Sequence, residues 1–139
     1  MTATLDDIRE TFALLDDWEE RYRYIIELGR ALPPLPEAEH IPENKVRGCS
    51  SQVWMVAALS PDDPPRLLLA GDSDAHIVKG LIAILFALYD GKTPREAAEF
   101  DARAALAEFG LAEHLSPTRT NGLFAMVNRI GDLARQAAA

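Results

Sequence analysis

Cysteine is scarce in this sequence of 139 residues, and Cys49 is the only one. A single thiol cannot close a disulfide within the chain, and it cannot supply the several thiolates that hold an iron–sulfur cluster. The three histidines, His40, His76 and His114, do not have the spacing of a metal-binding pair, so we expect no metal site. If Cys49 is reactive, it acts as a lone nucleophile or sulfur carrier that hands its cargo to another protein.

Long hydrophobic runs and an excess of positive charge are also missing. The most apolar stretch, Ile77 to Tyr89, is interrupted by Lys79 and Gly80 and is too short to span a bilayer. The first residues do not resemble a signal peptide, so we expect a cytoplasmic protein in a compartment that keeps thiols reduced. With 22 acidic and 14 basic residues the net charge is −8, which disfavours binding to nucleic acid.

The hydrophobic pattern predicts helices at both ends of the chain and strands between them. Apolar spacing predicts a first helix from a Thr4 cap and a second from Trp18, as a hairpin or as one kinked helix. Strand-forming runs at Lys45 to Gly48, Gln52 to Leu59 and Arg66 to Ala70 predict a small antiparallel sheet of about three strands. Further helices follow, so the predicted class is α+β, with helices flanking the sheet.

Several polar residues are interpreted as helix caps. Asp72, Ser73 and Asp74 are placed to cap a helix that runs from Ala75 to Tyr89. Thr93 and Asp101 are placed to cap two more helices, and Thr120 or Asn121 to cap the last one.

The surroundings of Cys49 favour a turn on the surface. Gly48 precedes it and the polar Ser50 and Ser51 follow, whereas a structural cysteine is usually a small buried hydrophobic residue. If the strand before it is extended, Lys45, Arg47 and Cys49 point the same way, and two cations would favour the reactive thiolate. The alternative is that both cations are simply solvated.

The run from Lys45 to Trp54, with Gly48-Cys49-Ser50-Ser51-Gln52 at its centre, resembles the cysteine motif of the SufE family of sulfur acceptors, which includes CsdE. Three further blocks resemble the family in order and spacing: Asp72 to Leu81, Tyr89 to Pro94, and Leu115 to Leu123. Ser50 stands where many members have glutamine, and Thr118 and Thr120 where serines are usual, which leaves the preferred partner open.

The resemblance implies a single SufE-like domain over residues 1–139, with an α+β fold similar to that of the IscU/NifU scaffold. It implies a sulfur-transfer accessory protein rather than a stand-alone enzyme. Cys49 would take persulfide sulfur from a PLP-dependent cysteine desulfurase of the SufS/CsdA type, stimulate that enzyme, and pass the sulfur to a SufBCD-type scaffold for iron–sulfur cluster assembly. The PLP belongs to the desulfurase, so no cofactor is expected here, and the chain would be a monomer or a homodimer.

The resemblance also assigns candidate site residues around Cys49, the persulfide acceptor. Lys45, Arg47, Gly48, Ser50 and Ser51 would form its supporting loop. Asp74, Arg119 and Asn121 would contact the partner or support the loop. Two alternatives remain: a cluster scaffold, which one cysteine makes improbable, and a regulatory adaptor that binds a desulfurase without carrying sulfur.

Overall fold

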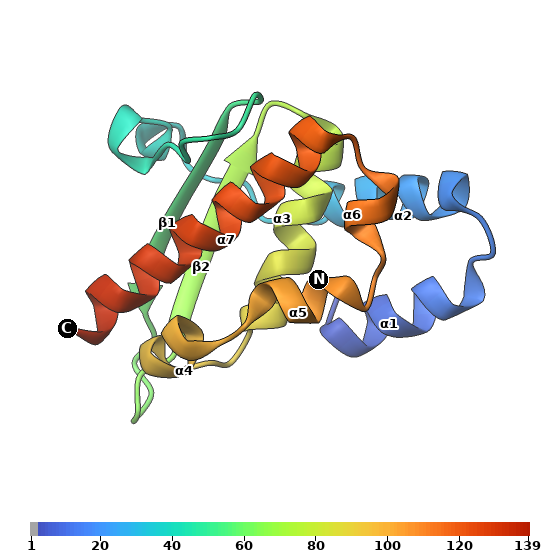
Figure 1. The fold of residues 1–139 in the computed structure, drawn as a ribbon. Helices are drawn as coiled ribbons and strands as arrows, with labels where there is room; N and C mark the ends of the chain where they lie inside the picture. The colour runs from blue at the N-terminus through green and yellow to red at the C-terminus, as the bar shows by residue number, and fades with distance from the viewer. Residues whose placement is uncertain (1–2) are drawn as a thin grey trace.

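Residues 3–139, which the computed structural model describes, form two strands and seven α-helices (Figure 1). The strands are β1 (Val53–Leu59) and β2 (Leu67–Ser73). The helices are α1 (Leu5–Leu14), α2 (Trp18–Arg30), α3 (His76–Tyr89), α4 (Pro94–Glu99), α5 (Ala102–Ala107), α6 (Leu111–His114) and α7 (Pro117–Ala138). Two short 3-10 turns, η1 (Glu37–Glu39) and η2 (Pro42–Asn44), precede the sheet. The predicted α+β class is confirmed.

The sheet buries one of its faces under helices. Its strands pair antiparallel, from Val53 opposite Ser73 to Leu59 opposite Leu67. Because side chains alternate along a strand, Val53 and Met55 point into the core, where both are completely buried. Helix α7 packs on β1 and α3 on β2, and Figure 1 shows α7 crossing in front of the sheet.

The prediction of a third strand, from Lys45 to Gly48, is wrong. Lys45 makes one isolated bridge to Trp54, and the adjacent Val46 N–H donates to the Val53 carbonyl at 2.8 Å. The η2 turn ends directly before this contact, and Gly48 turns the chain directly after it, so a longer strand has no room.

Strand β2 is longer than the sequence predicts. It continues from the predicted end at Ala70 through Gly71 and Asp72 to Ser73. These last residues are poor strand formers, and their pairing with β1 overrides that preference.

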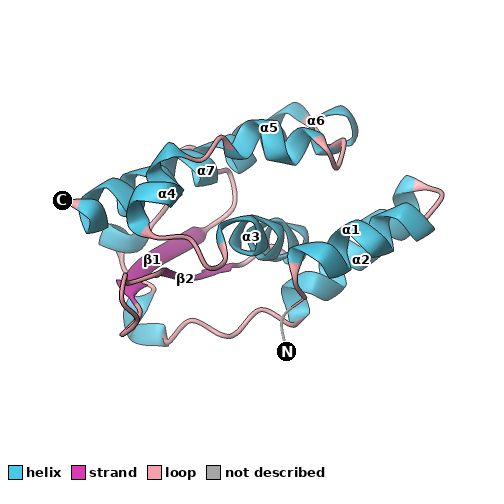
Figure 2. Ribbon diagram, turned by 90° about the horizontal axis from the view of Figure 1, so that it is seen from below, coloured by secondary structure: helices cyan, strands magenta, loops and turns pink. Residues whose placement is uncertain are grey.

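The first two helices form a hairpin, which decides between the two predicted arrangements (Figure 2). Thr4 caps α1, where the Asp7 N–H donates to the Thr4 hydroxyl at 3.2 Å, so the predicted cap is confirmed. Asp17 caps α2, and Phe12 packs edge-on against Trp18 across the turn.

Helices α2 and α3 cross in backbone contact because glycines lie at the crossing. A Cβ added to Gly29 would lie 2.6 Å from the Gly80 nitrogen, and one added to Gly80 would overlap the Ile25 carbonyl. Ile25 is itself completely buried there. Any larger side chain would force these two helices apart.

The predicted cap of α3 is wrong. Asp72 and Ser73 still belong to β2, and Ala75 occupies the cap position without a side-chain hydrogen bond. The Ser73 hydroxyl accepts the Ala75 N–H at 3.2 Å instead.

The predicted cap of the last helix is wrong as well. Helix α7 begins at Pro117 and is capped by Ser116, so Thr120 and Asn121 lie inside its first turns. The predicted caps Thr93, for α4, and Asp101, for α5, are confirmed. Over the described residues, none of the helices is long and apolar enough to cross a membrane.

Candidate functional site

Cys49 lies on the connection between η2 and β1, residues 45–52, which we call the Cys49 loop. Its side chain is half-buried and turned toward α7 rather than fully exposed. The thiol S–H donates to the Gly122 carbonyl, with 3.4 Å between sulfur and oxygen. A Cβ added to Gly122 would lie 3.6 Å from the Cys49 sulfur, in ordinary contact distance. The loop therefore rests its thiol on the first turns of α7.

Gly48 shapes the turn that places the thiol. Its φ of +93° lies in the region that L-residues rarely adopt. A Cβ at this position would also lie 3.1 Å from the Ala125 side chain of α7. Glycine is thus required both for the backbone conformation and for the close approach of the loop to the helix.

The sulfur faces a small hollow of about 20 Å³. Its apolar side comes from α3 and α7, through Val78, Leu81, Leu123 and Met126. Its polar side comes from Ser50, Ser51, Thr118 and Arg119. A space of this size holds roughly one water-sized sphere, so one more atom beside the thiol fits there.

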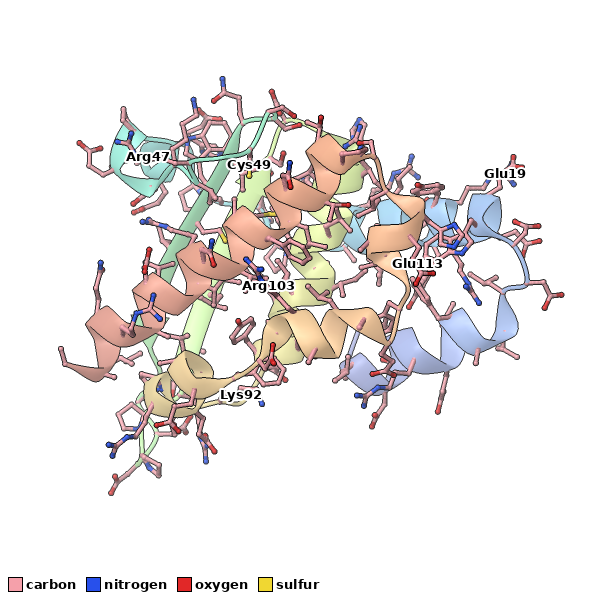
Figure 3. All side chains as sticks on the ribbon, viewed as in Figure 1. Glu19, Arg47, Cys49, Lys92, Arg103 and Glu113 are labelled. Carbon is pink, nitrogen blue, oxygen red and sulfur yellow. The ribbon has the colours of Figure 1, made fainter. Side chains whose placement is uncertain are left out.

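The predicted activation of Cys49 by Lys45 and Arg47 is wrong for the resting structure. Side chains alternate only along an extended backbone, and the turn at Arg47 and Gly48 breaks the alternation. Both cationic residues are exposed, and Figure 3 shows Arg47 well apart from Cys49. Burial raises the pKa of the Cys49 thiol above its ordinary value, so the resting thiol is protonated at neutral pH.

The remaining candidate residues lie at different distances from the thiol. The Asp74 carboxylate accepts the Gln52 N–H at 3.0 Å, and the Asp74 N–H donates to the Gln52 carbonyl, which joins the end of the loop to β2. Arg119 is exposed and lines the hollow. Asn121 is also exposed on α7 but does not line it.

The histidines take no part in the hollow as the described residues define it. His40 lies on the other side of β1, where its ring packs edge-on against Trp54 and its Nε2 is 2.9 Å from the Asp72 carboxylate. The hydrogen bond with Asp72 raises the pKa of His40. Burial alone would raise the pKa of Asp72, but the hydrogen bond with His40 and the charge of Lys79 hold it below its usual value. No three potential metal ligands cluster anywhere in residues 3–139.

Sequence reasoning missed the apolar wall of the hollow and the part of α7 on which the thiol rests. Gly122 lies within the block that resembles the SufE family, but its contact with Cys49 joins residues 73 positions apart. Val78 and Leu81 have ordinary helical spacing, which predicts burial and not what they border.

Comparisons with known proteins show the family of this chain. Residues 6–134 match the family model of SufE, described as the Fe-S metabolism associated domain. The chain belongs to the SufE family. An uncharacterized SufE-like protein of Rhizobium etli is 54% identical over 138 residues, which cover 99% of this chain and 93% of that protein. A second one, from Rhizobium meliloti, is 51% identical over 128 residues and covers 91% of each chain.

The fold of this SufE-family chain also resembles a solved structure. The solution structure of a hypothetical protein from Thermus thermophilus superposes with a TM-score of 0.76, over 96% of this chain and 95% of the other. At 24% sequence identity, this likeness concerns the fold alone. The family membership places the protein in iron–sulfur metabolism as a sulfur acceptor.

Proposed function

We propose that Cys49 accepts persulfide sulfur from a PLP-dependent cysteine desulfurase of the SufS/CsdA type, stimulates that enzyme, and delivers the sulfur to a SufBCD-type scaffold. The observation that carries the proposal is the placement of the only thiol of the chain. It lies half-buried on a loop, against a hollow, and at the edge of the packed core. The proposed setting is the cytoplasm, where such a thiol stays reduced.

The transfer is an exchange at a sulfur–sulfur bond. The Cys49 thiolate attacks the terminal sulfur of the desulfurase persulfide, a new bond forms between the two sulfur atoms, and the desulfurase cysteine leaves as a thiolate. The sulfane sulfur keeps its oxidation state, so the step needs no external oxidant or reductant. The proton of Cys49 passes to the departing thiolate, directly or through water. Delivery repeats the same step with a thiolate of the scaffold as the attacking group.

The resting conformation of the site suits the holding of transferred sulfur and not the attack of the thiol on a persulfide. The thiol is protonated because burial raises the pKa of Cys49, and the Gly122 carbonyl accepts a hydrogen bond from the protonated form. Activation therefore belongs to the docked state, in which the loop leaves α7 and the thiol meets a more polar or positive environment in the desulfurase. Once loaded, the added sulfur fits the hollow of about 20 Å³ beside Val78 and Met126. There it is shielded from small reductants.

The test is a mass measurement on the intact protein. The protein is incubated with a SufS-type desulfurase, PLP and cysteine, and its mass is recorded before and after a reductant. We expect a gain of one sulfur, about 32 Da, that the reductant removes and that Cys49→Ser lacks. Failure of the wild-type chain to gain sulfur from any desulfurase of this type would reject the proposal.

Two controls separate the alternatives. If Cys49→Ser stimulates the desulfurase as strongly as the wild type does, the chain is a regulatory adaptor and not a carrier. If anaerobic reconstitution gives a stoichiometric coloured cluster, the chain is a scaffold. We expect the variant to lose most of the stimulation and reconstitution to give no cluster.

A further inference from the structure

Arg129 connects α7 to η2 and β1, the two elements that flank the Cys49 loop and that we call its ends. Its Nη2 donates to the Met55 carbonyl at 3.0 Å and to the Glu43 carbonyl at 3.3 Å. Glu43 lies six residues before Cys49 and Met55 six residues after it. One guanidinium nitrogen thus joins η2, β1 and α7 where the loop begins and ends.

The Arg129 guanidinium supplies a hydrogen bond that a third strand would otherwise have made to β1. Val46 pairs with Val53, and in a continued antiparallel ladder the Asn44 N–H would donate to the Met55 carbonyl. The Asn44 N–H donates instead to the Ile41 carbonyl within the η2 turn. A buried carbonyl without a donor is costly, and Arg129 supplies the donor from another element.

The contacts of α7 with the loop follow one face of the helix. Gly122, Ala125 and Arg129 are three and four residues apart, the spacing of neighbours on a helix surface. The Gly122 carbonyl accepts one weak hydrogen bond from the Cys49 thiol, and Gly48 lies so near Ala125 that an added Cβ would be 3.1 Å from it. Arg129 adds charge-assisted hydrogen bonds, which are roughly twice as strong as neutral ones. This face of α7 therefore holds the tip of the loop, around Cys49, weakly and the two ends of the loop firmly.

We infer that Arg129 is a positioning residue that fixes both ends of the Cys49 loop to α7, so that opening is confined to the tip around Cys49. Its relevance to sulfur transfer rests on the proposed function, but its control of Cys49 exposure does not. The Nε of Arg129 is buried without a hydrogen-bond partner in residues 3–139. Nη2 therefore makes the hydrogen bonds that hold this side chain, to the Glu43 and Met55 carbonyls.

The test compares three variants of the free protein, without a desulfurase. Arg129→Met removes the donor and keeps the apolar stem, Arg129→Lys keeps a shorter donor, and Arg135→Met is the matched control. Arg135 lies on the same helix but pairs with Asp132 at the surface. The readouts are the alkylation rate of Cys49 and amide hydrogen exchange resolved along the chain.

We expect Arg129→Met to alkylate about tenfold faster, because the closed state loses its charge-assisted hydrogen bonds to the Glu43 and Met55 carbonyls. Exchange should rise in residues 43–55 and stay unchanged in α2 and α3. Arg129→Lys should fall between, at about threefold, and Arg135→Met should match the wild type. Alkylation of both Arg129 variants at the wild-type rate would overturn the inference. So would exchange that rises equally throughout the chain, since this indicates a general loss of stability.

Three further outcomes are also decisive. If Arg129→Met does not fold, the Lys variant carries the test under the same criteria. If alkylation responds as expected but the wild-type chain takes no sulfur from any desulfurase, the proposed function fails and the positioning role stands. If the wild type does take sulfur, persulfide on Arg129→Met should be lost to a small thiol faster than persulfide on Arg135→Met.

Discussion

The crossing of α2 and α3 and the contact of the Cys49 loop with α7 both depend on glycine, but they differ in strength. At the crossing, Gly29 and Gly80 bring two backbones together within a buried apolar surface. At the loop, Gly48 lets a half-buried thiol approach α7, where the Gly122 carbonyl accepts one weak hydrogen bond. The contact between α2 and α3 therefore stays closed, whereas the Cys49 loop can leave α7 at a low cost in free energy. A carrier needs both, because a loop can move only on a fixed frame.

The largest effect should come from filling the crossing. Gly80→Ala places a methyl group on the Ile25 backbone and should lower the free energy of unfolding by about 3 kcal/mol. Gly131→Ala in α7 is the matched control, since its Cβ would meet only the flexible end of Arg135, at 3.3 Å. Higher helix propensity should make that variant more stable by roughly 0.5–1 kcal/mol. Urea unfolding measures both, and equal effects would contradict the distinction between the two glycines.

A smaller effect is expected from Gly48→Ala. The positive φ should cost about 1–2 kcal/mol, and the 3.1 Å approach to Ala125 should push the loop off α7 and speed the alkylation of Cys49. Gly91→Ala shares the positive φ, +77°, but its Cβ would meet nothing within 4 Å. It should therefore lose stability without any change in alkylation. Equal alkylation rates in the two variants would show that strain alone, and not the contact with α7, governs exposure.

The pH dependence of Cys49 should be weaker still but of definite sign. Because the pKa of Cys49 is raised in the folded chain, its stabilising contribution is complete below the pKa of the unfolded thiol. That contribution is lost as the pH rises through the folded pKa. Alkylation of the native protein should accordingly reach half its maximum at a higher pH than alkylation of the chain in urea. The same midpoint in both states would mean that the hollow does not desolvate the thiol.

The sequence predicts only part of the site around Cys49. The turn at Cys49 follows from Gly48 and the serines, which are local signals. Because of the same turn, Lys45, Arg47 and Cys49 do not point the same way, since side chains alternate only along an extended backbone.

Arg129 shows why other contacts are invisible in the sequence. An arginine in the middle of an amphipathic helix has the appearance of a solvated residue. Its partners here are carbonyls of Glu43 and Met55, and every residue has a carbonyl, so no side-chain pattern marks them. The third strand fails because η2 and the turn at Gly48 leave it no room, and Arg129 supplies the donor that the Met55 carbonyl then lacks.

The smallest expected effect concerns the chain that leads into the loop. His40 ties this segment to β2 through Asp72, with the Glu37 and Lys79 charges nearby. Because the pKa of His40 is raised by its hydrogen bond with Asp72, its contribution to stability is complete below the unfolded pKa and is lost as the pH rises through the folded one. An NMR titration of His40 should show the raised pKa in the wild type and a lower one in Asp72→Asn. Alkylation of Cys49 should be equally fast in both, because Arg129 and not His40 fixes the ends of the loop. Faster alkylation in Asp72→Asn would show that the hydrogen bond between His40 and Asp72 also restrains the loop.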